Sequence, residues 1–123
     1  MQANPVGWFE IYVQDMSRAK TFYQTVLETQ FEKLTGAELE MWAFKSDMTQ
    51  YGAGGALVKM EGMSSGGNSI LVYFGCPDCA IEAARVKEAG GKVEREKMSI
   101  GDYGFIALAT DTEGNMFGLH SLQ

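Results

Sequence analysis

Two stretches of the sequence, 63 residues apart (71 minus 8), decide the fold. Residues 8–15 read Trp-Phe-Glu-Ile-Tyr-Val-Gln-Asp, and residues 71–78 read Leu-Val-Tyr-Phe-Gly-Cys-Pro-Asp. Each is a short apolar run that ends on an aspartate, which is the pattern of a strand followed by a helix N-cap. The same offset superposes Gly55 on Gly118 and Leu57 on His120. We therefore predict two similar half-chains of about 60 residues.

Each half shows the same succession of elements, one strand, one helix and three further strands. The first half has a strand at 7–13, a helix at about 17–28 and strands at 31–33, 39–45 and 57–60. The second half has a strand at 70–75, a helix at about 79–89 and strands at 92–97, 103–109 and 115–121. We predict one α+β domain over residues 1–123, with module one at 6–61, a Gly- and Ser-rich linker at 62–69 and module two at 70–123.

Composition limits the classes of function. Hydrophobic residues make up 46% and charged residues 21%, the balance of a globular protein. A net charge of −6 argues against a nucleic-acid partner, because phosphate binding needs a basic surface. No apolar stretch reaches the roughly 20 residues that span a bilayer, and residues 1–5 lack the features of a secretory signal. We expect a cytoplasmic protein without membrane contact, and its two cysteines fit that compartment.

Three motifs in order carry a resemblance to a known family. Residues 10–27 (Glu-Ile-Tyr-Val-Gln-Asp-Met-Ser-Arg-Ala-Lys-Thr-Phe-Tyr-Gln-Thr-Val-Leu) resemble the opening signature of the vicinal-oxygen-chelate superfamily, the glyoxalase/bleomycin-resistance/dioxygenase group. Residues 89–93 resemble the family's helix stop, and residues 111–119 (Asp-Thr-Glu-Gly-Asn-Met-Phe-Gly-Leu) its closing turn and last strand. The resemblance implies two βαβββ modules that form curved mixed sheets around a cavity, and a homodimer.

The resemblance also implies positions for a divalent metal, on the first and last strands of each module. Counting from Asp15 and Gly114 places these positions on Trp8 and Gly118, and the 63-residue offset adds Leu71 and Gly55. None of these side chains offers the carboxylate or imidazole donor that such cations require. We therefore expect no metal cofactor, which puts the family's metal-dependent activities in doubt.

Two polar residues lie two positions beyond those slots. Glu10 shares a strand face with Trp8, and His120 shares one with Gly118, because side chains alternate along a strand. Three interpretations stay open for Glu10 and His120: a displaced metal site, a general acid/base pair, and ordinary polar residues of a pocket or dimer interface.

Aromatic residues on the predicted strands are candidates for contact with a small organic ligand, although core packing is the commoner role of such residues. Trp8 and Tyr12 share the face of Glu10 and are the first choices. The full set of substrate-binding candidates is Trp8, Tyr12, Trp42, Tyr73 and Tyr103.

Cys76 and Cys79 form a C-x-x-C motif between a strand and a helix, which is formally the setting of a redox site with a lowered thiol pKa. The repeat explains the same segment as the counterpart of residues 13–16, a structural turn. We favour the turn, since the chain has no second ligand pair for zinc.

Three functions remain open from the sequence. The first is an enzyme of glyoxalase ancestry with metal-independent lyase- or isomerase-type acid–base chemistry on Glu10 and His120. The second is a bleomycin-resistance-type protein that sequesters a small molecule without catalysis. The third is a domain whose cavity is vestigial and whose dimerisation matters more.

Overall fold

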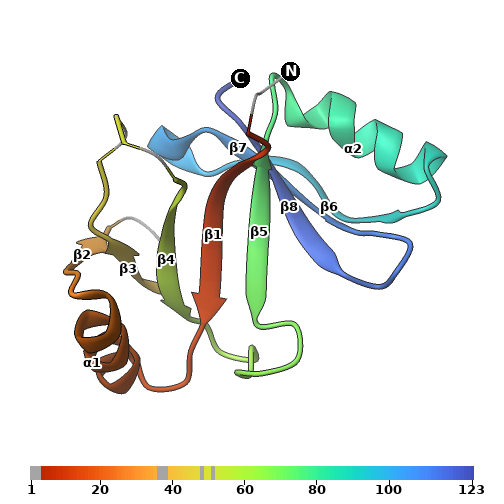
Figure 1. The fold of residues 1–123 in the computed structure, drawn as a ribbon. Helices are drawn as coiled ribbons and strands as arrows, with labels where there is room; N and C mark the ends of the chain where they lie inside the picture. Colours follow the sequence, from red (N-terminus) through yellow and green to blue (C-terminus); the bar gives the residue numbers. More distant parts are fainter. Residues whose placement is uncertain (1–3, 36–38, 48, 51) are drawn as a thin grey trace. The chain divides into compact units, whose positions relative to one another are not determined.

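The structure is a computed structural model that describes residues 4–35, 39–47, 49–50 and 52–123. Residues 1–3, which belong to the stretch where we expect no secretory signal, lie outside the described residues. The described chain has eight strands and two α-helices, which confirms the α+β class and the two βαβββ modules (Figure 1). No helix in the described ranges is long and apolar enough to cross a membrane.

The chain divides into two compact units. The N-terminal unit is Phe9–Ile70, and the C-terminal unit comprises Met1–Trp8 with Leu71–Gln123. Strand β1 (Val6–Tyr12) contributes residues to both units, because the division falls between Trp8 and Phe9. Its first residues are anchored in the C-terminal unit, where the amide of Gly75 donates to the carbonyl of Pro5 at 2.9 Å.

The N-terminal unit holds helix α1 (Met16–Leu27), which follows β1, and strands β2 (Phe31–Leu34), β3 (Glu40–Phe44) and β4 (Gly54–Lys59). The strand order is β2-β3-β4-β1, and the β2–β3 and β3–β4 pairs are antiparallel. Asp15 caps α1 as expected, since its carboxylate accepts from the amide of Arg18 at 3.0 Å.

The core of the N-terminal unit lies between α1 and one face of its strands. Val13, Met16 and Leu57 are buried there. The partly buried residues packed against them are Ile11, Ala19, Tyr23, Phe31, Trp42 and Phe44. Odd-numbered residues of β1 therefore face the helix, and even-numbered residues lie on the opposite, helix-free face.

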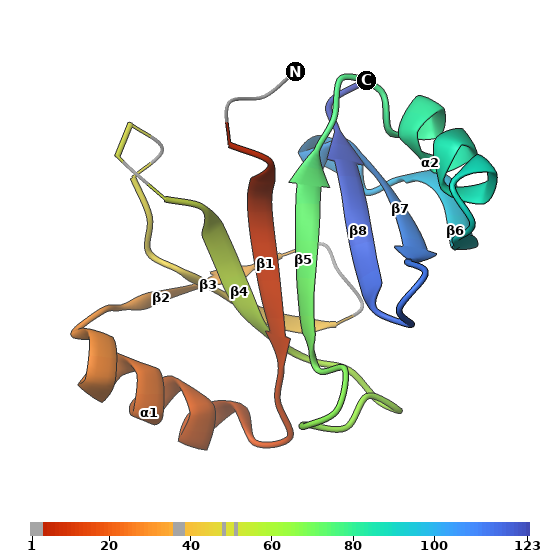
Figure 2. The same ribbon diagram turned by 45° about the vertical axis from the view of Figure 1, so that its right-hand side comes forward.

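The C-terminal unit holds strand β5 (Ile70–Gly75), helix α2 (Cys79–Glu88), strand β6 (Lys92–Ser99), the 3₁₀ turn η1 (Gly101–Tyr103), strand β7 (Phe105–Thr110) and strand β8 (Met116–Ser121). The strand order is β5-β8-β7-β6. The β5–β8 pair is parallel and the other two pairs are antiparallel, so the sheet is mixed. Figure 2 shows α2 beside β6, β7 and β8.

The core of this unit lies between α2 and its sheet. Cys79, Ala83, Ala107 and Leu119 are buried there, with Phe74, Phe117 and Val86 among the partly buried residues against them. Asp78 caps the N-terminus of α2 as expected. Gly90 follows the C-terminal end of the helix with a φ of 97°, a conformation that favours glycine.

Two expectations about the second module are wrong. The strand predicted at 103–109 begins at Phe105, because residues 101–103 form η1 and Gly104 turns the chain with a φ of 103°. Tyr103 therefore lies in a 3₁₀ turn rather than in a strand. The repeat offset is also not constant. The amide of Val13 donates to the carbonyl of Val58, and that of Cys76 to the carbonyl of His120, so the last strands correspond at an offset of 62.

Candidate functional site

The helix-free face of the C-terminal unit carries the only histidine of the chain. His120 lies on β8 opposite Ile106 of β7 and Gly75 of β5. Phe117 and Leu119 pack on the α2 side, so alternation places His120 and Gly118 on the opposite side. His120 is half-buried. Because Gly75 has no side chain, the strand position beside the imidazole contributes only backbone.

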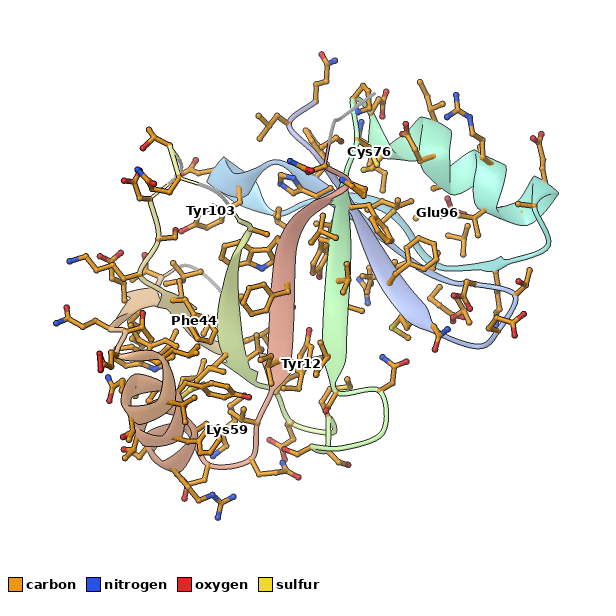
Figure 3. The ribbon with its side chains drawn as sticks, in the orientation of Figure 1. Tyr12, Phe44, Lys59, Cys76, Glu96 and Tyr103 are labelled. Atoms are coloured by element: carbon orange, nitrogen blue, oxygen red, sulfur yellow. The ribbon has the colours of Figure 1, made fainter. Side chains whose placement is uncertain are left out.

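A short hydrogen bond fixes the imidazole. His120 Nε2 lies 2.6 Å from the carbonyl oxygen of Tyr103, at the end of η1. Tyr103, labelled in Figure 3, is 52% exposed. It contacts the candidate histidine through its backbone carbonyl, and not through the phenol ring for which it was a candidate.

The ring of Tyr73 occupies the position beside Gly118. These two residues are register partners on β5 and β8. A Cβ atom built on Gly118 would overlap the Tyr73 ring, which is buried. The space that a metal-binding side chain at residue 118 would need is thus filled by a neighbouring aromatic ring.

The other positions implied for a metal also lack donors. The 62-residue offset makes Ala56, not Gly55, the counterpart of Gly118. The strand faces agree with this, because Gly118 is on a helix-free face whereas a Cβ on Gly55 would overlap Phe9 on the helix side. Trp8, Leu71 and Ala56 supply no oxygen, sulfur or imidazole ligand. Among the described residues, no group of three His, Cys, Asp or Glu side chains could hold a metal ion. The residues present do not fit the family's divalent cation.

A second polar group lies in the N-terminal unit. Glu10 and Tyr12 are both buried on the helix-free face of β1, and the Tyr12 hydroxyl donates to Glu10 Oε1 at 2.8 Å. Figure 3 labels Tyr12 near the end of β1. Trp8 precedes Glu10 on the same face of the strand, as its even position requires. The structure thus brings Glu10 and Tyr12 together, while His120 belongs to the other unit.

Trp42 lies apart from Glu10 and Tyr12. It pairs with Leu57 across β3 and β4 and packs in the core beneath α1. Its ring is covered by the Lys20 ammonium at 3.4 Å, and its indole Nε1 donates to Glu40 at 3.2 Å. Trp42 is therefore on the helix side of its unit, whereas the other substrate-binding candidates on strands are on helix-free faces.

The C-x-x-C motif does not have the electrostatics of a reactive thiol. Burial, followed by the charge of Glu82, raises the pKa of Cys76 from its ordinary 9.0 to about 11. The lowered pKa that a helix N-terminus would favour is overcome by these two effects. Cys79 is fully buried, and its amide donates to Ser121 Oγ at 3.0 Å. The segment is a packed turn, labelled at Cys76 in Figure 3.

Sequence reasoning missed four contributors to the C-terminal group. Gly75 pairs with His120 on β5, and Ile106 and Leu108 pair with His120 and Gly118 on β7. Gly104 sets the turn that carries the Tyr103 carbonyl. The register of β5, β7 and β8 reveals these neighbours, and a single sequence does not specify that register.

Comparisons with known proteins agree with the fold. The family sequence model of the Glyoxalase/Bleomycin resistance protein/Dioxygenase superfamily matches residues 6–119. No curated protein sequence matches the chain. A hypothetical protein from Bacillus halodurans C-125 has a similar structure, with a TM-score of 0.76 and 13% identity over 99% of this chain and 96% of that one.

Two further solved structures are similar, one named as an enzyme and one as a superfamily member. Methylmalonyl-CoA epimerase in complex with methylmalonyl-CoA and NH4⁺ has a TM-score of 0.70 and 17% identity, covering 98% of this chain and 95% of that one. A superfamily member from Vibrio splendidus 12B01 has a TM-score of 0.63 and 17% identity, covering 92% and 95%. At these identities the likeness concerns the fold alone.

Proposed function

Because this chain belongs to the Glyoxalase/Bleomycin resistance protein/Dioxygenase superfamily, we propose that it binds a small organic molecule without the family's divalent metal. The binding surface is the helix-free face of the C-terminal unit, around Tyr73 and His120. The proposed chemistry is proton transfer of the lyase or isomerase type, with His120 as the proton acceptor.

The observation that carries the proposal is the pairing of Tyr73 with Gly118. The family resemblance implies a metal ligand at residue 118 on the last strand, whereas the space beside this residue holds a phenol ring. An aromatic ring beside two apolar side chains, Ile106 and Leu108, is the usual lining of a small-molecule site. His120 adds one polar side chain, an imidazole, which is a common proton acceptor in acid–base catalysis.

In the N-terminal unit, Glu10 on the helix-free face of β1 is a separate candidate for proton transfer. Its carboxylate is buried and accepts a hydrogen bond from the Tyr12 hydroxyl, which fixes the direction of Glu10 Oε1. Trp8, which belongs to the C-terminal unit, is proposed as a further apolar contact for the ligand of that unit. The solved relative that holds methylmalonyl-CoA is named an epimerase. Acyl-CoA thioesters therefore belong in a first ligand panel, beside small aromatic carbonyl compounds.

Thermal melting of chelator-treated protein tests the metal-free part of the proposal. We expect no saturable shift with Ni²⁺, Zn²⁺, Mn²⁺ or Fe²⁺. A ligand that binds only the folded state at a hundredfold excess over Kd stabilises it by about 2.7 kcal/mol. A saturable increase with one metal that disappears in His120→Ala or Glu10→Ala would overturn the metal-free proposal. The same assay with the organic panel identifies a ligand.

A sequestering protein is the second candidate function. A half-buried histidine held by a backbone carbonyl is compatible with pure ligand recognition. His120→Ala separates the two functions. If His120 accepts a proton in a reaction, the variant loses turnover and keeps its affinity for the ligand. If the chain only sequesters, no turnover is found in either protein.

We further propose that the chain forms a homodimer in the cytoplasm. Large apolar side chains are exposed on the isolated chain, among them Phe22, Val26 and Leu27 of α1 at 57–58%. Exposed apolar side chains of this size are common at protein–protein interfaces. Sedimentation analysis over a range of concentrations tests this, and a monomer at all concentrations contradicts it.

A further inference from the structure

The hydrogen bond between His120 and Tyr103 decides which ring nitrogen can accept a proton. A backbone carbonyl has no proton to donate, so the 2.6 Å contact requires the hydrogen on His120 Nε2. A neutral imidazole carries one N–H, which leaves the lone pair on Nδ1. The neutral His120 is therefore held in one tautomer, with Nδ1 as its acceptor.

The Tyr103 carbonyl is held in turn by the glycine that follows it. Gly104 has φ 103° and ψ −132°, and its amide donates to the carbonyl of Gly101 at 3.2 Å. Its own carbonyl accepts from the amide of Ile100 at 2.8 Å, which closes the turn on both sides. The direction of the Tyr103 carbonyl is thus set by the peptide unit that it shares with Gly104.

A side chain at residue 104 would disturb this arrangement. A Cβ built on Gly104 would overlap the backbone carbonyl oxygen of Ser121 and lie 3.3 Å from Leu122 Cα. Backbone atoms cannot move aside as a flexible side chain can, and Ser121 is further fixed because its hydroxyl accepts from the Cys79 amide. Only glycine satisfies both the positive φ and the close approach.

We propose that Gly104 is a positioning residue for His120: it holds the Tyr103 carbonyl against Nε2 and thereby presents Nδ1 as the proton acceptor. The catalytic meaning of Nδ1 rests on the proposed function, whereas the tautomer itself does not. The positioning acts through the η1 turn and involves no contact between Gly104 and a ligand.

The single histidine makes the test direct, because ¹⁵N-labelled histidine gives only the signals of His120. In alkaline buffer we expect the wild-type ring to carry its proton on Nε2, with an Nε2–H signal that exchanges slowly with water. In Gly104→Ala this exchange becomes about fivefold to tenfold faster, as loss of one ordinary hydrogen bond predicts. A proton on Nδ1 in the wild type overturns the inference, as does unchanged exchange in folded Gly104→Ala.

Two further variants keep the test decisive. Gly114→Ala is the matched control, because Gly114 also has a positive φ, 85°, and a Cβ there would meet no atom within 4 Å. Its Nε2–H exchange should equal that of the wild type, and faster exchange there would overturn the inference.

If Gly104→Ala does not fold, Gly101→Ala decides, since it strains the same turn without a clash. Faster exchange than in the wild type supports the inference, and unchanged exchange overturns it.

The outcome is separable from that of the proposed function. If the protein shows the Nε2–H tautomer and its dependence on Gly104 but has no turnover, the positioning role stands and the enzymatic function is wrong. If it has turnover but carries the proton on Nδ1, the enzymatic function stands and the positioning role is wrong.

Discussion

Tyr73 and Gly118 face each other across the β5–β8 pair, and the phenol ring fills the space that any side chain at residue 118 would enter. The Tyr73 ring and a side chain at residue 118 are therefore mutually exclusive. Residue 118 has to be glycine beside this ring, because even a Cβ atom there would overlap it.

We expect Gly118→Ala to destabilise the fold by about 1–3 kcal/mol, the usual cost of adding atoms to a packed position. The cost should fall in a Tyr73→Ala background, because the added methyl group then has room. Urea denaturation of the four proteins of this double-mutant cycle measures the coupling. Equal costs in both backgrounds would contradict the steric explanation.

Glu10 and Tyr12 provide a test in the N-terminal unit. Tyr12→Phe removes the hydroxyl that donates to Glu10 Oε1 and leaves the ring in place. Because the carboxylate is buried, we expect a loss of about 1–3 kcal/mol in the free energy of unfolding. Tyr23→Phe is the control, since that ring packs edge-on against Phe44. A loss in Tyr12→Phe no larger than in the control would count against the hydrogen bond.

The sequence was sufficient for the βαβββ order because its signals are local. Asp15 and Asp78 cap the two helices, and Gly114 takes the positive φ of the last turn. Each depends on the chemistry of one residue and its near neighbours. The absence of metal donors at Trp8 and Gly118 could also be predicted from residue type alone.

Which site residues lie together depends on the register between strands, and the sequence alone did not determine that register. The second module is one residue shorter between Cys76 and His120 than the first between Val13 and Val58, and a shift of one residue moves a side chain to the other face. The 63-residue offset therefore paired Leu57 with His120 incorrectly. Tyr103 was placed on a strand because nothing in its own residue type distinguishes a strand from the η1 turn.

Asp78 links the helix cap to the outer strand. Its carboxylate accepts from Lys97 Nζ at 2.9 Å and from the Ala80 amide, and these two hydrogen bonds lower the pKa of Asp78. A carboxyl whose pKa is lower in the folded state stabilises the fold above its ordinary pKa of about 3.8, and this contribution disappears as pH falls. Lys97→Met should reduce the loss of melting temperature between about pH 5 and pH 2.

Lys87→Met is the matched control for this measurement. Lys87 also pairs with a carboxylate, Glu96 at 3.4 Å, but both side chains are more than 60% exposed and such pairs contribute little. Its acid profile should follow that of the wild type. If the two lysine variants lose melting temperature identically as pH falls, Lys97 is not the cause of the lowered Asp78 pKa.

Cys76 should be slow to react despite its position before a helix. With a pKa of about 11, on the order of one thiol in a thousand is ionised at pH 8, and the thiolate is the reactive form. Glu82→Gln removes a negative charge that raises the pKa of Cys76, so the pKa should fall and alkylation by iodoacetamide should become faster. Glu88→Gln, at the other end of α2, should leave the rate unchanged.

The same raised pKa predicts how stability depends on alkaline pH. The folded state retains the Cys76 proton to about pH 11, whereas the thiol of the unfolded chain loses it near 9.0. The unfolded state therefore binds fewer protons between these values, and the free energy of unfolding falls as pH rises through them. Cys76→Ser lacks this titration, so its denaturation midpoint should fall less over the same range. A wild-type profile parallel to that of Cys76→Ser would show that the thiol ionises equally in both states and that burial and Glu82 do not hold its proton.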